Sequence, residues 1–148
     1  MTIYLTPDEV QRIHDREIGE EGLPGVDRGR LEAAVCRCQA TVFGEDAFPT
    51  IHDKAAALFA GIIKNHPFAD GNKRTAVLAT YVFYALNGYT LVAEAGEIVA
   101  LALATAQGYI DLDETRYEVA LETIAARLAG WAQPIKFYDP ALDEGDLG

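Results

Sequence analysis

The chain contains little cysteine, and the two cysteines it has cannot act together. Cys36 and Cys38 stand two positions apart in a segment with helical periodicity, so their side chains point in different directions. They can therefore neither form a disulfide with each other nor share a metal ion. A disulfide-stapled scaffold is excluded, and no cluster of histidine and cysteine has the spacing of a zinc site.

The chain also lacks a long hydrophobic run. Its longest apolar stretches, residues 55–63 and 76–86, are too short to cross a bilayer, and the start MTIYLTPDE lacks the basic and apolar regions of a signal peptide. We therefore expect a cytoplasmic protein. With 148 residues, half of them hydrophobic, the chain is long enough for the single core of one domain.

Positive charge is scarce as well. Twelve basic residues face 23 acidic ones, and the resulting net charge of −11 repels nucleic acids and anionic membranes, so neither is a favoured partner. The end of the chain, DPALDEGDLG, is acidic, and we expect residues 1–132 to form the domain and residues 133–148 an acidic tail. A polyanion such as a nucleotide then needs local cations, backbone N–H groups and a divalent metal.

Helix start and stop signals are frequent. Thr6 is a suitable N-cap, Pro7 fits the first helical position, and Glu9 completes a capping box. Apolar residues recur with helical spacing in most of the remaining chain. The helices we expect are residues 7–17, a helix from Asp27, and residues 55–64, 73–86, 94–106 and 114–131.

Two segments favour strands instead. Residues 3–5 are expected to form a short N-terminal strand, and residues 40–51 combine β-branched and aromatic residues with Gly44 and Pro49, which indicates an extended flap or hairpin. The fold class that follows is all-α, with a small β flap.

The two most apolar helices flank a polar segment, KNHPFADGNKRTA (residues 64–76). Pro67 disfavours helical geometry at His66, so the first of these helices should end there, with the imidazole pointing into the loop. Phe68 is expected to anchor the loop in the core, and Pro67 to stiffen it. So many polar groups between core helices require pairing, solvation at a cleft, or a ligand.

The second half of this segment is suited to phosphate. Asp70 and Gly71 form a turn, and Asn72 is a suitable N-cap for a helix beginning at Lys73. Unpaired N–H groups and the dipole at that helix start, helped by Lys73 and Arg74, would hold a phosphate even in an acidic protein.

Each polar residue of the segment can be given a task. His66 can take a proton from an attacking hydroxyl group, because imidazole titrates near neutral pH. Asp70 is a hard oxygen ligand suited to Mg²⁺ on nucleotide phosphates. The groups assigned to phosphate binding, with the two cations also offsetting the charge that develops during transfer, are Gly71, Asn72, Lys73 and Arg74.

Structural interpretations of the same residues remain open at this point. A histidine before a proline is commonly a helix end, and DG before a cation is an ordinary turn. The spacing of a P-loop and the G-x-S-x-G sequence are both absent. His14 is expected on a half-exposed helix face and His52 at a helix start, and neither is assigned a catalytic role.

The nine residues HPFADGNKR resemble the signature of the Fic/Doc superfamily, H-P-F-x-[DE]-G-N followed by two further positions. LTPDEVQRIHD, GLPGVDRGRLEAAV and TAVLATYVFYALNG extend the resemblance over roughly residues 3–130, and these segments are similar to the death-on-curing (Doc) branch. The resemblance implies a Fic/Doc helical bundle in which a central helix-loop-helix carries the motif. It also implies Mg-ATP chemistry, with His66 activating a target hydroxyl and Asp70 holding the metal.

The residue at position 73 bears on the reaction. Most Fic proteins have glycine there and transfer AMP, whereas Doc proteins have lysine and transfer the γ-phosphate, so Lys73 favours a kinase. For the Doc branch the resemblance implies a threonine of elongation factor Tu as target, arrested translation as outcome, and a small cognate antitoxin as partner.

Two alternatives stay open. Pro67 and Gly71 match the Fic form of the motif more closely than the Doc form, so a Fic-type AMP transferase remains possible on the same scaffold. The other alternative is a non-catalytic Fic-like binding module. The chain contains no clear [ST]-x-x-x-E-[GN] inhibitory segment, since TLVAEAG departs from that pattern after Glu94. The lack of such a segment favours inhibition by a separate antitoxin over self-inhibition.

Overall fold

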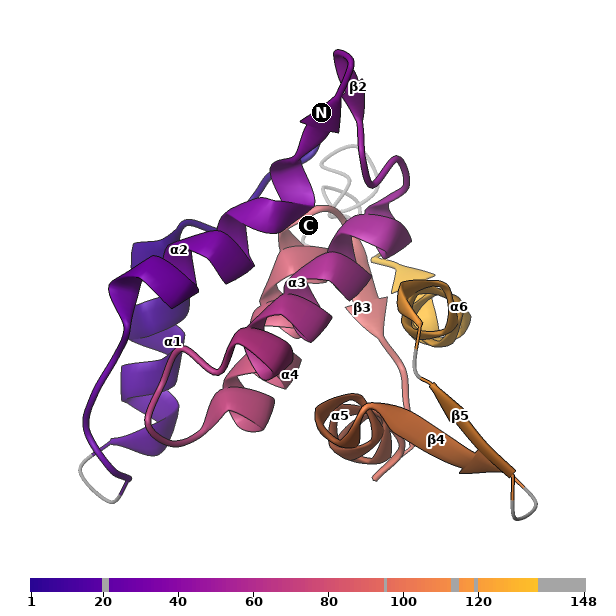
Figure 1. The fold of residues 1–148 in the computed structure, drawn as a ribbon. Coiled ribbons are helices and arrows are strands. Elements are labelled where there is room, and N and C mark those ends of the chain that lie inside the picture. The colour runs from indigo at the N-terminus through magenta and orange to yellow at the C-terminus, as the bar shows by residue number, and fades with distance from the viewer. Residues whose placement is uncertain (20–21, 95, 113–114, 119, 136–148) are drawn as a thin grey trace, which may run out of the picture.

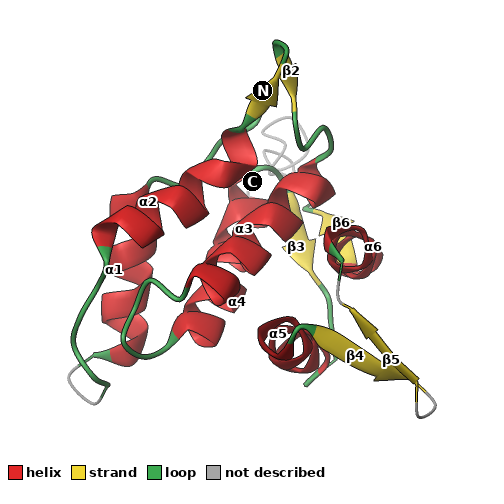
Figure 2. Cartoon of the chain, viewed as in Figure 1, coloured by secondary structure: helices red, strands yellow, loops and turns green. Residues whose placement is uncertain are grey.

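The computed structural model describes residues 1–19, 22–94, 96–112, 115–118 and 120–135, and these residues form a mostly helical domain (Figures 1 and 2). The all-α expectation is confirmed. The helices are α1 (Pro7–Ile18), α2 (Arg28–Cys36), α3 (Ile51–Asn65), α4 (Asn72–Leu86), α5 (Glu97–Gln107) and α6 (Leu121–Trp131), with a 3₁₀ turn, η1 (Arg37–Gln39), after α2.

The starts of α1 and α3 are set by capping boxes. In α1 the Thr6 hydroxyl accepts from the Glu9 N–H at 3.1 Å, and the Glu9 carboxylate accepts from the Thr6 N–H at 3.0 Å, as expected. Thr50 and Asp53 form the same reciprocal pair, so α3 begins four residues earlier than its apolar run indicates. Each box satisfies two N–H groups that the helix cannot pair itself.

Helix α3 forms the centre of the core. It packs against α2, α4, α5 and α6, and every residue from Lys54 to Ile63 is buried, which confirms the expected central helix (Figure 1). Gly61 lets α2 approach closely, since a Cβ there would lie 3.0 Å from the Ala34 carbonyl oxygen. Helix α1 packs against α4 and α2.

The strands in the described residues are short and pair antiparallel in twos (Figure 2). They are β1 (Thr41–Val42) with β2 (Glu45–Asp46), β3 (Tyr89–Leu91) with β6 (Ala132–Pro134), and β4 (Tyr109–Leu112) with β5 (Thr115–Glu118). The β1–β2 hairpin lies within residues 40–51, where an extended flap or hairpin was expected. It projects at the top of the view in Figure 1.

Two of the expected secondary-structure elements were wrong, a strand over residues 3–5 and a helix over the whole of residues 114–131. Residues 3–5 are not a strand, because the backbone of Ile3 pairs with a side chain instead of another strand. Asn87 Oδ1 accepts from the Ile3 N–H, and Asn87 Nδ2 donates to the Ile3 carbonyl oxygen, both at 2.8 Å. The helix expected over residues 114–131 begins only at Leu121. Residues 115–118 pair with β4 instead, because Thr and Tyr favour strands, and the helical spacing of that stretch was ambiguous.

The C-terminal end of the described chain belongs to the folded body. β6 pairs with β3 up to Pro134, so the first two residues of the expected tail lie in a strand. The next residue, Ile135, donates its N–H to the Gly88 carbonyl oxygen at 2.9 Å, and residues 136–148 fall outside the described residues. Within the part that is described, no helix is long and apolar enough to span a bilayer.

Candidate active site

Residues 66–71, the motif loop, join the two most apolar helices. Helix α3 ends at Asn65, and His66 is its C-cap in the left-handed region, with φ 51° and ψ 56°. Its N–H donates to the Ile62 carbonyl oxygen at 3.2 Å, closing the last turn. Pro67 ends the helix as expected. His66 is exposed, and the imidazole is therefore accessible to a substrate.

The α1–α2 connector, residues 22–27, holds the motif loop from one side. The Asp27 N–H donates to the Pro67 carbonyl oxygen at 2.7 Å, and the Ala69 N–H donates to the Gly25 carbonyl oxygen at 3.1 Å. Between these bonds, Val26 and Phe68 form an isolated antiparallel bridge. The loop backbone is thereby fixed like a short strand although it joins two helices.

Asn72 closes the loop from within. Its Oδ1 accepts from the Phe68 N–H at 3.0 Å, and its Nδ2 donates to the Phe68 carbonyl oxygen at 2.8 Å. Asn72 was expected to be the N-cap of α4, and this was wrong: Gly71 is the N-cap, with φ 82°, and Asn72 is the first helical residue. The reason is that the buried Phe68 backbone needs both partners, which the Asn72 amide supplies.

The N-terminus of α4 offers unpaired N–H groups. In the described structure, the backbone N–H groups of Gly71, Asn72, Lys73 and Arg74 have no protein acceptor, and we call this group the amide cradle. Lys73 and Arg74 are exposed beside it. Arg74 Nε lies 3.9 Å from Glu17 Oε1 on α1, a long contact between exposed groups that leaves the guanidinium accessible.

The Asp70 carboxyl group is exposed on the same loop. Within the described residues it forms no ion pair, and no group of three or more metal-ligating side chains comes together. Its backbone is fixed, because the Asp70 carbonyl oxygen accepts from His14 Nε2 at 2.8 Å. A single carboxylate with no competing cation suits an ion that takes its other ligands from phosphate and water.

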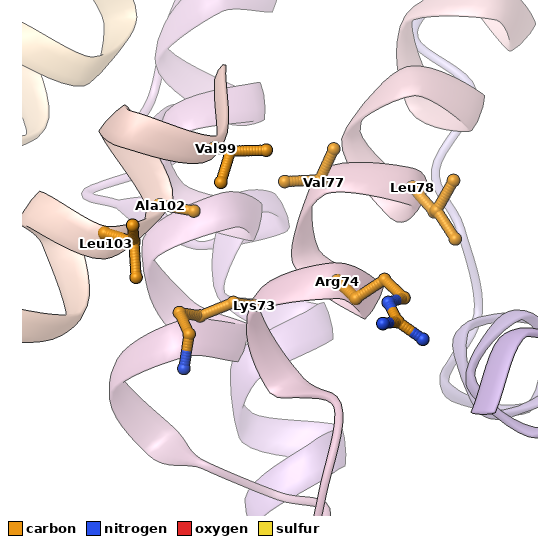
Figure 3. A pocket seen from close by; sticks show the side chains of 7 residues that line it. All are labelled: Lys73, Arg74, Val77, Leu78, Val99, Ala102 and Leu103. Carbon is orange, nitrogen blue, oxygen red and sulfur yellow. The ribbon is translucent and has the colours of Figure 1, made fainter. Parts of the chain in front are cut away.

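An apolar pocket of about 420 Å³ lies beside the amide cradle, between α4 and α5 (Figure 3). Figure 3 shows Val77 and Val99 pointing toward each other, with Lys73 and Arg74 at the same end of α4 as the cradle. The lining residues are Lys73, Arg74, Val77, Leu78, Val99, Ala102 and Leu103. Its size falls within the range of small-molecule sites, about 300–1,000 Å³.

The structure therefore gathers the residues singled out from the sequence at one loop. His66 and Asp70 are exposed on it, Pro67 and Phe68 are buried beneath it, and the assigned phosphate-binding residues begin the next helix. For Asn72, the backbone N–H is open while the side chain is engaged with Phe68.

His14 was misjudged from the sequence. It was expected on a half-exposed face, but its exposed fraction is 5%, and its ring stacks on Phe68 beneath the motif loop. The sequence contained a signal for this burial. His14 lies four residues after Val10, which is fully buried, and therefore on the same helix face.

His52 lies in the first turn of α3, as expected. Its Nδ1 is 2.9 Å from the Tyr84 hydroxyl oxygen, away from the motif loop. Burial, reinforced by Tyr89 and Asp53, raises the pKa of Tyr84, so this hydroxyl keeps its proton and can donate it to His52. The contact is structural.

Comparisons with known proteins agree with this arrangement. A model of the Fic/DOC family matches residues 4–84, which include α1 to α3, the motif loop and most of α4. The chain is 42% identical over 132 residues to a protein of Mycolicibacterium smegmatis named Toxin Doc, covering 89% of this chain and 95% of that protein. It is 33% identical over 111 residues to a protein of Escherichia phage P1 named Protein kinase doc, covering 74% of this chain and 86% of that protein.

Proposed function

Since the chain belongs to the Fic/DOC family, we propose that it is a Doc-type toxin that transfers the γ-phosphate of Mg-ATP to a protein hydroxyl group. The observation that carries the proposal is the set of three chemical groups that one loop places in order along the chain. An exposed imidazole stands at its start, an exposed carboxylate within it, and an open amide cradle at its end. These are the groups that phosphoryl transfer requires.

His66 is the proposed general base. It lies at the C-terminal end of α3, exposed, and its backbone is fixed by the left-handed cap and the bond to Ile62. A neutral imidazole nitrogen accepts the proton of the incoming hydroxyl group as its oxygen attacks the γ-phosphorus. The bond from this phosphorus to the bridging oxygen breaks, and the electron pair leaves with ADP.

The amide cradle is the proposed phosphate site. Its N–H groups point outward from the start of a fifteen-residue helix, where the helix dipole favours negative charge. Lys73 and Arg74 add two exposed cations to offset the charge that develops on the transferred group. Lys73 also carries the preference for phosphate transfer over AMP transfer that the resemblance implies.

Asp70 is the proposed ligand of Mg²⁺. The donor set fits this ion, because one exposed carboxylate without a cationic partner leaves the other positions to phosphate oxygens and water. When bound, the ion neutralises charge on the β- and γ-phosphates. We place the nucleoside of ATP in the pocket between α4 and α5, whose apolar walls begin next to Lys73.

The remaining parts of the proposal concern partners. The two relatives are named a toxin and a protein kinase, and on this basis we propose a cognate antitoxin as partner of this chain. A threonine of elongation factor Tu is the proposed target, with arrested translation in the cytoplasm as the outcome. A net charge of −11 is consistent with a protein partner rather than nucleic acid.

The test uses the purified full chain, a bacterial lysate, and ATP labelled at either the α- or the γ-phosphate. Transfer of the γ label, with a mass increment of one phosphoryl group on one acceptor protein, is expected. His66→Ala should lower the rate about 10²- to 10⁴-fold, because it removes the base. His52→Ala is the matched control, since His52 lies on the same helix away from the loop.

The other possible results of this experiment distinguish the two alternative functions and test the role of His66. Transfer of the α label would identify a Fic-type AMP transferase. If no nucleotide yields an adduct, and antitoxin binding is unchanged in His66→Ala, the chain is a non-catalytic binding module. Full transfer by His66→Ala would remove His66 from the mechanism.

A further inference from the structure

A buried imidazole on α1 contacts the motif loop from below. The His14 ring lies almost parallel to the Phe68 ring, with the centroids 3.8 Å apart and an interplanar angle of 5°. Phe68 has an exposed fraction of 1%, so the stack lies inside the core. It fixes the motif loop against a helix more than fifty residues away in sequence.

The same imidazole donates a hydrogen bond to the loop backbone. His14 Nε2 lies 2.8 Å from the Asp70 carbonyl oxygen. A carbonyl oxygen can only accept, so Nε2 carries the hydrogen and donates it. His14 Nδ1 lies 2.9 Å from Asp15 Oδ1, which also only accepts, so both contacts are hydrogen bonds when both ring nitrogens carry hydrogen.

Within the described residues, His14 is the one donor to the Asp70 carbonyl oxygen. The next backbone hydrogen bonds along the loop run from the Ala69 N–H to the Gly25 carbonyl oxygen and from the Thr75 N–H to the Gly71 carbonyl oxygen. Asp70 lies between these two hydrogen bonds, and the bond from His14 restrains the peptide that joins Asp70 to Gly71. The backbone of Asp70 in turn limits the rotamers that its side chain can adopt.

From these contacts we propose that His14 is a positioning residue of the active site. Through the Nε2 bond it orients the Asp70 peptide, so that the Asp70 carboxylate points to the place where the metal and the phosphates bind. Through the stack on Phe68 it holds the loop at its proper distance from α1. This proposal rests on the proposed function for its effect on transfer, but the loop geometry can be tested without any reaction.

Two variants separate the donor from the ring. His14→Phe keeps an aromatic ring on Phe68 and loses the donor, whereas His14→Gln keeps an N–H donor near the Nε2 position and loses the ring. His52→Phe is the matched control, because it removes a ring hydrogen bond of similar length, to Tyr84, that does not touch the motif loop. All three are made in the full chain.

The first readout is amide hydrogen exchange. In His14→Phe, exchange within residues 68–72 should accelerate about tenfold or more at the bonded N–H groups of Phe68 and Ala69, while the interior of α3 and the second half of α4 stay protected. His14→Gln should restore much of the protection of the loop. His52→Phe should leave residues 68–72 as in the parent chain.

The second readout is metal affinity. Mn²⁺ bound in the presence of ATP, followed by electron paramagnetic resonance, should bind several-fold more weakly to His14→Phe than to the parent. The transfer rate at saturating ATP should fall roughly ten- to a hundredfold, because a small misplacement of a metal-holding group is enough for such a loss. His14→Gln should recover part of both.

The outcomes that overturn the proposal are distinct. If His14→Phe has the exchange and Mn²⁺ affinity of the parent, His14 does not position Asp70. If His14→Phe and His14→Gln lose thermal stability equally and the whole core exchanges faster, His14 is a general packing residue. A parent chain that transfers nothing contradicts the proposed function, while exchange at residues 68–72 still decides the role of His14.

Discussion

The side-chain amide of Asn72 forms two hydrogen bonds with the backbone of one residue, Phe68, at 3.0 Å and 2.8 Å. Both residues are buried, and the pair closes the turn from which Asp70 projects. An asparagine at this position is therefore required by the loop itself, whether or not a nucleotide is bound. Its backbone N–H remains available for the phosphate that we propose binds there.

Asn72→Ala should lower the free energy of unfolding by about 2–3 kcal/mol, because it leaves the buried N–H and carbonyl groups of Phe68 without hydrogen-bond partners. Urea denaturation measures this. Asn65→Ala is the matched control: Asn65 is exposed, and its long bond to the Arg30 carbonyl oxygen, 3.3 Å, should contribute less than about 0.5 kcal/mol. Equal losses in the two variants would contradict the role given to the Asn72–Phe68 pair.

Gly71→Ala should destabilise the chain by about 1–2 kcal/mol, since Gly71 has φ 82° in the left-handed region. An added Cβ would also lie 2.2 Å from Ile18 Cδ1, so the Ile18 side chain must move. Adding Ile18→Ala should relieve the overlap but leave the backbone strain. Gly130→Ala, with open space around its Cα, is the control and should be neutral or stabilising by about 0.5 kcal/mol in thermal denaturation.

Local signals in the sequence were sufficient for most helix boundaries and for the position of the loop. Thr6 and Glu9, for example, carry their capping box within four residues, and Pro67 ends α3 by its own geometry. What was misjudged depends on contacts between buried or distant groups. Residues 3–5 are held by Asn87, 84 positions away in sequence from Ile3, and no local pattern reports that contact. The spacing of His14 from Val10 indicates a buried helix face but not the motif loop that covers it. Asn72 has a partner only four residues away, but its role follows from the burial of the Phe68 backbone, which the sequence alone does not show.

Burial raises the pKa of the Cys38 thiol from 9.0 to about 11. The folded state thus favours the protonated thiol, so this contribution to stability is complete below pH 9 and is lost as the pH rises toward 11. In Cys38→Ala, the melting temperature should therefore fall less steeply between pH 9 and 11 than in the parent. Cys36→Ser, at the exposed cysteine, removes only the smaller Coulombic contribution of Cys36 to this pKa and should keep most of the slope of the parent.

Alkylation gives an independent check of the same shift. At pH 8 the folded chain should react with iodoacetamide at Cys36, while Cys38 stays unmodified until the chain unfolds, because both burial and the scarcity of thiolate protect it. Peptide mass spectrometry distinguishes the two sites. Rapid modification of Cys38 in the folded chain would contradict the burial described here.

Leu103→Asp tests the pocket between α4 and α5. Leu103 is exposed by 46% at the pocket wall, so the folded chain tolerates a polar residue there, but a carboxylate would repel the nucleotide and remove apolar contact. KM for ATP should rise about tenfold or more with little change in melting temperature. Leu86→Asp, at a similarly exposed leucine outside this pocket, is the control. An unchanged KM would place the nucleoside elsewhere.

Lys54 anchors the flap from the central helix. Its exposed fraction is 2%, and its Nζ donates to Asp46 Oδ2 at 3.0 Å and to the Phe48 carbonyl oxygen. The flap strands have two residues each, which is too short to hold a hairpin in place without such support. The buried ammonium group thus fixes the position of the flap relative to α3.

In Lys54→Met, the flap should lose this anchor while the core stays packed, because methionine fills a similar volume and Asp46, half exposed, can be hydrated. Amide exchange at Ala47, whose N–H donates to the Ala40 carbonyl oxygen at 2.9 Å, should accelerate about tenfold or more. If the flap aligns the protein target beside His66, KM for that target should rise more than KM for ATP. Lys64→Met, at the exposed end of α3, is the control, and equal exchange at Ala47 in both variants would show that the ammonium group does not hold the flap.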